Sequence, residues 1–386
     1  MTASTPRIAF LSRRAYGDVP LSQAPPAIRA LRQLEADQKL LVGPNILPDL
    51  LPTFPDELQG SCRGLVCRPN WGGKGKLTED LINRLRVPNQ PFVIATLSAG
   101  RDHIAGGRPL PNGVDVITSE GANSEQTAEL TVFLAAGLLR RALHPALNMG
   151  FGVFGRPDVL MTRSLVGVTW AVVGPGRVAC AVLRRAQAMG ASTLVAYYRT
   201  RNVALETAIR TENDLHNFTL TGDLLEAVRE ADVITIHLPH TPATAGMFDA
   251  QVFAAVKSSA VIINMGRHEV VNEHDLLNAL AERRFAGFAA DVLPEDAESI
   301  GSHPHSPAVP LWKRACWSLL SSIETCTNVS HSFNGTALAE KFDTPHPLSE
   351  RNLVLTPHIG AHTRDSEEAV ARDVVAQLLS RLGVVT

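Results

Sequence analysis

The sequence predicts an α/β protein in which short apolar strands alternate with helical segments and form parallel sheets. Apolar runs rich in Val, Ile and Leu recur along the chain, and segments of helical periodicity separate them, as in βα units. At 386 residues, 45% of them hydrophobic, the chain can fill about two or three domains. The predicted strands are Arg7–Leu11, Gly64–Cys67, Phe92–Thr96, Val114–Ile117, Thr169–Val173, Thr193–Tyr197, Val233–His237, Val261–Asn264, Gly287–Ala290 and Leu353–Thr356.

The longest predicted helix spans Ser124–Leu143 and connects two parts of the chain. Ser124 or Asn123 can cap its first turn, Glu125 suits the positive end of the helix dipole, and Arg140 suits the negative end. The alternation of elements stops at about residues 297–350, where Pro-containing turns recur without periodicity. A loop of this length is usually a functional lid or a disordered insert.

Composition excludes several classes of protein. The net charge of −2 and the pI of about 6.7 argue against a nucleic-acid binder, and the hydrophobic content argues against a disordered chain. The five cysteines include no Cys-x-x-Cys pair, so neither a zinc knuckle nor a disulfide framework is expected. No apolar run is long enough for a membrane span or a signal peptide, which favours the cytoplasm and no membrane partner.

A glycine-rich turn follows the predicted strand Thr169–Val173. Gly174 permits a tight turn, Gly176 lets the backbone approach a pyrophosphate, and the small Ala179 allows a helix to pack closely on the strand. With the predicted helix Cys180–Met189 behind it, the motif indicates a dinucleotide site in which N–H groups near Arg177 and Val178 face the anion. The alternative is a strand–turn–helix that uses its glycines only to turn.

The end of the next predicted strand carries no carboxylate, although NAD sites usually place one there to bind the ribose 2′-hydroxyl. The segment Tyr197–Arg201 instead offers Tyr198, Arg199, Thr200 and Arg201, and guanidinium groups suit a 2′-phosphate. NADP is therefore the first choice of cofactor. The alternative is that both arginines are solvated and that NAD, or either cofactor, binds.

Chemically active side chains follow three later strands. They lie in Asn264–Arg267, in Asp291–Asp296 and in Thr356–His362. Open α/β sheets bind ligands at the carboxyl ends of their strands, so this distribution predicts an enzyme.

The order of these motifs resembles the D-isomer-specific 2-hydroxyacid dehydrogenase family over nearly the whole chain. The resemblance implies two Rossmann-like domains with parallel sheets. A dinucleotide-binding domain at 123–359, with an insertion at about 297–350, would interrupt a discontinuous substrate domain at 1–122 and 360–386. It also implies a homodimer. The matching segments are Ser98–Ile104, Asn123–Glu129, Gly174–Ala179, His237–Thr244, Asn264–Arg267, Asp291–Val292 and Thr356–Gly360.

The resemblance implies a reaction in which a hydride moves between NAD(P)H and C2 of a 2-oxo or 2-hydroxy acid. Arg267 would pair with the substrate carboxylate and polarise its carbonyl, and His358 would be the acid/base, oriented by Glu295 or Asp296. Backbone N–H groups of Ala99 and Gly100 would bind the substrate carboxylate. The expected cofactor contacts are Gly174, Gly176, Arg177, Val178, Tyr198, Arg199, Thr200, Arg201, His237, Leu238, Pro239, Thr244, Met265 and Asp291, the last as acceptor for the nicotinamide carboxamide.

The sequence also departs from the family. His268 replaces the glycine that usually follows the arginine, Asp296 stands where a glutamate is usual, and Asp291 and His358 are 358 − 291 = 67 residues apart, which is longer than usual. Each of three residues also has an alternative role: Arg267 as a surface charge, His358 as a loop histidine, and Asp291 as a turn cap. A second function therefore stays open, a nicotinamide-responsive binding or scaffold protein with a degenerate site.

Cationic side chains near the expected substrate loops suggest a substrate with a second anionic group, such as a phosphate, phosphonate or carboxylate. Arg101 lies in the Ser98–Ile104 motif, and Arg68 and Lys76 border another Gly-rich loop. The alternative is that these side chains point into solvent. The histidines of the 297–350 stretch lack the tight spacing of metal ligands, so no metal site is expected.

Overall fold

The computed structural model describes residues 5–11, 24, 26–46, 56–67, 77–98, 100, 101, 104, 109–119, 121–142, 162–199, 203, 206, 207, 209, 211, 214–292 and 352–384. The chain divides into two compact units. One comprises Met1–Asn123 and Ala361–Thr386, and the other comprises Ser124–Gly360.

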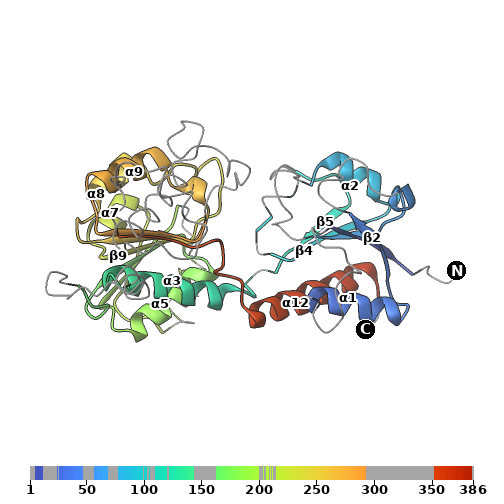
Figure 1. Cartoon of the computed structure of the whole chain (residues 1–386), viewed down its shortest axis with the longest axis horizontal. Coiled ribbons are helices and arrows are strands. Elements are labelled where there is room, and N and C mark those ends of the chain that lie inside the picture. The colour runs from blue at the N-terminus through green and yellow to red at the C-terminus, as the bar shows by residue number, and fades with distance from the viewer. Residues whose placement is uncertain are drawn as a thin grey trace, which may run out of the picture. The chain divides into compact units, whose positions relative to one another are not determined.

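The first unit is built on a parallel sheet of five strands in the order β2-β1-β3-β4-β5. Helices α1 and α12 pack on one face of this sheet, and α2 packs on the other (Figure 1). The elements are β1 (Arg7–Leu11), α1 (Pro26–Ala36), β2 (Leu41–Ile46), the 3₁₀ turn η3 (Asp56–Leu58), β3 (Gly64–Cys67), α2 (Glu79–Leu85), β4 (Phe92–Thr96), β5 (Val114–Ile117) and α12 (Arg364–Leu382).

The second unit is built on a parallel sheet of seven strands in the order β12-β11-β10-β9-β6-β7-β8. Helices α3 and α5 cover one face, and α7, α8 and α9 cover the other (Figure 1). The elements are α3 (Ser124–Leu139), β6 (Thr169–Val173), α5 (Arg177–Ala188), β7 (Thr193–Tyr197), β8 (Phe218–Thr221), α7 (Leu224–Arg229), β9 (Val233–Ile236), α8 (Ala250–Ala255), β10 (Val261–Asn264), η6 (His268–Val270), α9 (Glu273–Ala281), β11 (Gly287–Ala290) and β12 (Leu353–Leu355).

The α/β class with two parallel sheets is confirmed, and every strand predicted from sequence is present, two of them one residue shorter. Strands β2 and β8 were not predicted, and both lie at sheet edges. The β2 sequence contains Gly43 and Pro44, which normally argue against a strand. An edge strand tolerates proline because one side of its backbone needs no partner, and the β1–β2 pairing is irregular between Ile8 and Phe10.

Helix α3 ends four residues before the predicted Leu143. The N–H of Arg141 bonds to the carbonyl of Leu138, that of Ala142 bonds to the carbonyl of Gly137, and Arg141 has a φ of 47°. A left-handed residue with these two bonds closes a helix end. Helix α5 begins at Arg177, three residues before the predicted start, because the extended Gly176 already serves as its N-cap.

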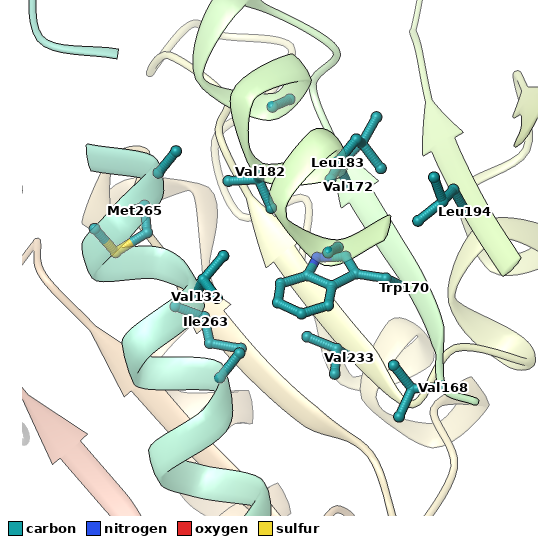
Figure 2. Packing of buried hydrophobic residues seen from close by; sticks show 14 of the residues in the cluster. Val132, Val168, Trp170, Val172, Val182, Leu183, Leu194, Val233, Ile263 and Met265 are labelled. Carbon is teal, nitrogen blue, oxygen red and sulfur yellow. The ribbon is translucent and has the colours of Figure 1, made fainter. Parts of the chain in front are cut away.

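A buried cluster between α3, α5 and the seven-stranded sheet holds the second unit together (Figure 2). Its largest member is Trp170 of β6, whose side chain is fully buried between Val172, Val182 and Val233. The indole N–H of Trp170 donates to Oγ1 of Thr235 at 3.3 Å. The one polar atom of this side chain is therefore satisfied, so its full area contributes to burial.

Asp232 anchors the amino-terminal edge of the same sheet. Its carboxylate accepts from the Thr169 N–H at 3.0 Å and lies 3.1 Å from Arg163 and 3.5 Å from Lys257. Burial alone would raise the pKa of Asp232, but the N–H and the two cations outweigh it, so the pKa lies below its usual value.

The strand order of the second unit reverses at β6. The chain runs outward from β6 through β7 to β8, and it then crosses back to place β9 on the other side of β6. Doubly wound sheets bind ligands at the carboxyl ends of the strands at this point. A ligand-binding site is therefore expected in the segments that follow β6, β9, β10, β11 and β12.

Candidate active site

The turn after β6 is shaped by Gly174. Its φ of +95° is left-handed, and a Cβ built on it would lie 2.8 Å from Cδ2 of Leu238. The Gly174 N–H donates to the carbonyl of Tyr197 at 3.1 Å, and the Gly176 N–H donates to the carbonyl of Gly174 at 2.9 Å. Only glycine meets both the conformational and the steric requirement at this position.

Helix α5 presents an open N-terminus directly after this turn. Gly176 caps the helix without a side-chain hydrogen bond and is exposed, and a Cβ built on it would have no atom of the described residues within 4 Å. Arg177 is also exposed, and Val178 is half-buried. The N–H groups of a first helical turn and the positive end of the helix dipole favour an anion, so the exposed N-terminus of α5 fits a diphosphate.

The end of β7 presents an exposed arginine. Tyr197 is buried, Tyr198 is half-buried and Arg199 is exposed. Burial raises the pKa of the Tyr197 hydroxyl, Arg199 opposes the rise and Asp223 adds to it. Oδ1 of Asp223 accepts from the N–H groups of Leu225 and Glu226. This carboxylate therefore caps α7.

The loop after β9 is held by Thr244. The Thr244 hydroxyl donates to the carbonyl of Pro239 at 2.7 Å and accepts from the Thr241 N–H at 2.8 Å, and the side chain is buried. Thr244, predicted as a cofactor contact, thus shapes the loop that carries Leu238 and the exposed Pro239.

His237 is the first residue after β9. Both ring nitrogens are buried and lack a hydrogen-bond partner within the part of the chain that the structure describes. Burial lowers the pKa of His237 to about 3, so the ring is neutral at physiological pH.

The turn after β10 holds Arg267. Oδ1 of Asn264 accepts from the Gly266 N–H at 3.1 Å, and Nδ2 of Asn264 donates to the carbonyl of Arg267 at 3.0 Å. A Cβ on Gly266 would clash with the carbonyl oxygen of Leu238, so the backbones of the β9 and β10 loops are in direct contact. The half-buried Arg267 donates from Nη1 to the carbonyl of Gly266 at 2.9 Å.

His268, where the family usually has glycine, begins η6 and lies beside Glu269. Nδ1 of His268 is 3.2 Å from Oε2 of Glu269, and Nδ1 of His240 is 3.5 Å from Oε1. The carboxylate of Glu269 thus joins the β9 loop to the β10 loop next to Arg267.

Met265, another predicted cofactor contact, packs among apolar side chains. It is 9% exposed, and its side chain belongs to the cluster with Val132 and Ile263 (Figure 2). A Cβ on Gly360 would lie 3.1 Å from Cε of Met265 and 2.8 Å from Oδ2 of Asp291. Met265 therefore packs between the buried cluster and the turn after β12.

Asp291, at the end of β11, organises the turn that carries His358. Its Oδ1 accepts from the Thr356 hydroxyl at 2.6 Å and the Ile359 N–H at 2.9 Å, and its Oδ2 accepts from the Gly360 N–H at 2.7 Å. Asp291 is 3% exposed, whereas His358 is exposed and has a φ of 57°. These three hydrogen bonds correspond to the alternative role of Asp291, that of a turn cap.

Within the first unit, two hydroxyl groups form a hydrogen-bonded chain after β4. Ser98 donates to the carbonyl of Gly100 at 2.7 Å, and Oγ1 of Thr96 lies 2.9 Å from Oγ of Ser98. Since the Ser98 proton is already donated, Thr96 is the donor in this second bond. Arg101, one residue beyond Gly100, is exposed.

The structure thus links the loops after five strands of the second unit by direct contacts: Gly174 with Leu238, Leu238 with Gly266, Met265 with Gly360, and Asp291 with the His358 turn. Sequence reasoning missed Asn264 as the clamp of the Arg267 turn, and Thr96 and Ser98 as the support of Gly100. An asparagine two residues before a glycine in a turn is a signal that could have found the first. The predicted site residues outside the described residues are Arg68, Lys76, Ala99, Thr200, Arg201, Glu295 and Asp296, as is the 297–350 stretch.

Two searches of the described residues bear on other kinds of site. No group of three or more His, Cys, Asp or Glu among them could hold a metal ion. No helix among them is both long and apolar enough to cross a membrane.

Comparison with known proteins identifies relatives. The chain is 25% identical over 320 residues to a glyoxylate/hydroxypyruvate reductase of Arabidopsis thaliana, covering 83% of this chain and 82% of the relative. It is 25% identical over 312 residues to the glyoxylate reductase of Thermococcus litoralis, covering 79% and 78%. A D-3-phosphoglycerate dehydrogenase of Saccharomyces cerevisiae is 26% identical over 306 residues, which span 79% of this chain but 55% of the yeast enzyme.

Solved structures share the fold. The TT0316 protein from Thermus thermophilus superimposes with a TM-score of 0.65 at 25% identity, covering 97% of each chain. The D-lactate dehydrogenase of Aquifex aeolicus, complexed with NAD and lactic acid, superimposes with a TM-score of 0.64 at 21% identity, covering 97% of this chain and 96% of that one.

The family model described as D-isomer specific 2-hydroxyacid dehydrogenase, NAD binding domain, matches residues 132–360, which is more than half of the chain. The matched region contains the Gly174 turn, the Arg267 turn and the Asp291–His358 connection. This chain belongs to the D-isomer specific 2-hydroxyacid dehydrogenase family, whose members are NAD(P)-dependent oxidoreductases.

Proposed function

We propose that this protein transfers a hydride between NAD(P)H and C2 of a 2-oxo or 2-hydroxy acid. The observation that carries the proposal is the connection of Arg267 and His358 to one rim of the sheet, beside an open helix N-terminus. The orphaned imidazole of His237 and the empty space above Gly176 fit a dinucleotide diphosphate. When bound, the nicotinamide supplies or accepts the hydride.

Arg267 and His358 divide the remaining chemistry. The guanidinium of Arg267, always charged and forked, binds the substrate carboxylate and polarises the 2-oxo group as negative charge develops on its oxygen. The exposed imidazole of His358 gives a proton to that oxygen, and takes it back in the reverse direction. Asp291 holds the His358 turn and retains about one of its roughly four acceptor positions for a carboxamide N–H.

The preferred cofactor in this proposal is NADP. Arg199 is exposed at the end of β7, and the nearby carboxylate of Asp223 is engaged in capping α7. A guanidinium here favours the extra phosphate of NADP over the bare ribose of NAD. The proposed substrate carries a second anionic group, which the exposed Arg101 supports.

A cofactor-oxidation screen tests the proposal. NADPH and NADH are offered with 2-oxo acids, half of which carry a phosphate, phosphonate or second carboxylate, and His358→Ala is the catalytic control. We expect turnover that His358→Ala abolishes, with faster NADPH oxidation and preference for doubly anionic acids. Dinucleotide binding without turnover of any acid would instead support a binding or scaffold protein.

Gly176→Ala supplies an independent control for the dinucleotide site. The added Cβ meets no atom of the residues that the structure describes, so folding should be unaffected, whereas a diphosphate over the α5 N-terminus would meet it directly. We expect unchanged thermal stability and dinucleotide affinity reduced about tenfold or more. Unchanged affinity would place the dinucleotide elsewhere.

A further inference from the structure

Two buried polar side chains lie behind the Ser98 hydroxyl, where β3 and β4 end. Cys67 and Thr96 are register partners on these neighbouring strands, and both are fully buried. Cys67 packs in the cluster on the α2 face of the five-stranded sheet, and Thr96 has the parity of Ile94 from the same cluster. The thiol and the hydroxyl therefore lie on one face of the sheet, and a side-chain hydrogen bond joins them.

The donor and acceptor roles in this group are fixed from its outer end. The Ser98 hydroxyl donates to the Gly100 carbonyl at 2.7 Å, so the Thr96 hydroxyl, 2.9 Å from Oγ of Ser98, donates to that oxygen. The Thr96 oxygen is then an acceptor for Cys67. Burial raises the pKa of the Cys67 thiol to about 12, so the thiol keeps its proton and is the donor. The hydrogen bonds therefore run in one direction, from Cys67 through Thr96 and Ser98 to Gly100.

The last of these bonds sets the orientation of the peptide that joins Gly100 to Arg101. In a trans peptide the carbonyl and the following N–H point in opposite directions. Because the Gly100 carbonyl turns toward Ser98, the Arg101 N–H turns away from it. Arg101 is exposed, and its N–H has no acceptor among the residues that the structure describes. An outward N–H in a turn can bind an anionic oxygen, and the Arg101 carbonyl closes such a turn by accepting from the Ile104 N–H at 2.9 Å.

The backbone of Ser98 is held independently of its side chain. Its carbonyl accepts from the Ser119 N–H at 3.2 Å, which ties the segment after β4 to the segment after β5. With this backbone fixed, the Ser98 side chain can change only its rotamer. The Thr96 donor favours the rotamer that reaches the Gly100 carbonyl.

We propose that Thr96 is a positioning residue for substrate binding: by donating to Ser98, it holds the Gly100–Arg101 peptide with its N–H outward, where that N–H binds an anionic oxygen of the 2-oxo acid. Cys67 occupies the acceptor oxygen of Thr96 and so leaves the Thr96 proton for Ser98. Cys67 and Thr96 do not touch the substrate, because both are fully buried. This inference rests on the proposed function, which makes a 2-oxo acid the substrate.

The experiment compares Thr96→Val, which keeps the shape of threonine without its hydroxyl, with Thr96→Ser, which keeps the hydroxyl and loses a methyl group. Steady-state kinetics with the preferred cofactor give KM and kcat for glyoxylate and for 3-phosphohydroxypyruvate. Calorimetric titration with oxalate, which has no ketone to reduce, measures anion binding without turnover, and thermal unfolding measures stability. Thr131→Val is the matched control, because Thr131 is fully buried and donates to the Thr127 carbonyl within α3 of the other unit.

We expect Thr96→Val to raise the KM for the acids and the Kd of oxalate about fivefold, the effect of one neutral hydrogen bond, while kcat stays within about twofold of the wild-type value. Thr96→Ser should keep the wild-type KM and Kd, although the lost methyl group lowers its melting temperature. A packing role predicts the reverse order, with serine binding the acids more weakly than valine. Thr131→Val should leave KM, kcat and oxalate binding unchanged.

Either of two results would overturn the inference while leaving the proposed function intact. One is a wild-type KM and a wild-type oxalate affinity in Thr96→Val. The other is a loss of binding in Thr96→Ser that equals or exceeds the loss in Thr96→Val. If the wild-type protein reduced no 2-oxo acid, the proposed function would fail, and the oxalate affinities would decide the inference: no binding to the wild type, or equal binding to Thr96→Val, would overturn it.

Discussion

Replacing Asp291 with asparagine tests how the His358 turn is held. In the wild type, one carboxylate oxygen accepts from the Thr356 hydroxyl and the Ile359 N–H, and the other accepts from the Gly360 N–H at 2.7 Å. Asparagine can keep the first oxygen, but it then turns an NH₂ group toward the Gly360 N–H. One charge-assisted bond is lost, and two donors face each other in a buried place.

The expected loss of stability follows from the lost hydrogen bond and the opposed donors. A hydrogen bond to a charged group contributes about 1.5–3 kcal/mol, and the opposed donors add to the loss, so we expect Asp291→Asn to lower the free energy of unfolding by about 2–3 kcal/mol. For a unit of this size each kcal/mol corresponds to about 2–4 °C, so the melting temperature should fall by about 4–12 °C.

Thermal unfolding measures the global effect, and amide hydrogen exchange of Ile359 and Gly360 measures the local one. Asp249→Asn is the matched control, because a single oxygen of Asp249 accepts both N–H groups at the start of α8, and asparagine caps helices equally well. An Asp291→Asn protein that melts with the wild type and keeps both amides protected would refute the reasoning.

Three further outcomes are expected. Gly266→Ala should destabilise the protein by about 1–3 kcal/mol in urea unfolding, because its Cβ would meet the Leu238 backbone; stability equal to wild type would mean that this contact relaxes freely. Since the folded pKa of Asp232 lies below its unfolded value of about 4, Asp232→Asn should cost stability at pH 7, and the deficit should shrink as the pH falls below about 4; a pH-independent deficit would contradict this. Ser98→Ala, which leaves the Gly100 carbonyl without its 2.7 Å donor, should raise the KM for the 2-oxo acid about fivefold with unchanged cofactor affinity, and a reversed pattern in steady-state kinetics would contradict it.

Features that depend on backbone conformation and strand order were predictable from the sequence. The Gly174 turn and the positions of Arg267, Asp291 and His358 after their strands follow from local patterns, because a short apolar run followed by a turn residue has few alternatives in a parallel sheet. Strand β2 was missed since its glycine and proline oppose a strand, and only its place at the sheet edge permits them.

The environments of single side chains were less predictable. The sequence shows that Thr244 and Met265 lie in motifs, but it does not show that the first bonds within its own loop and that the second packs in the core. Nor does it show that His237 has no partner, because burial depends on neighbours that are distant along the chain. The partner of a carboxylate is equally invisible when it lies 65 residues away, as Thr356 does from Asp291.

The bonds of Asp291 also bear on the tolerance of the fold to changes in length. Strand β11 pairs directly with β12, and Asp291 fastens the turn beyond β12, so both ends of the intervening segment are held independently of what that segment contains. The entropy of closing a loop grows only logarithmically, and a doubling of its length costs about 0.6 kcal/mol. Lengthening the chain between Val292 and Asn352 would therefore cost little stability, and the same junction is a suitable place to graft a foreign domain.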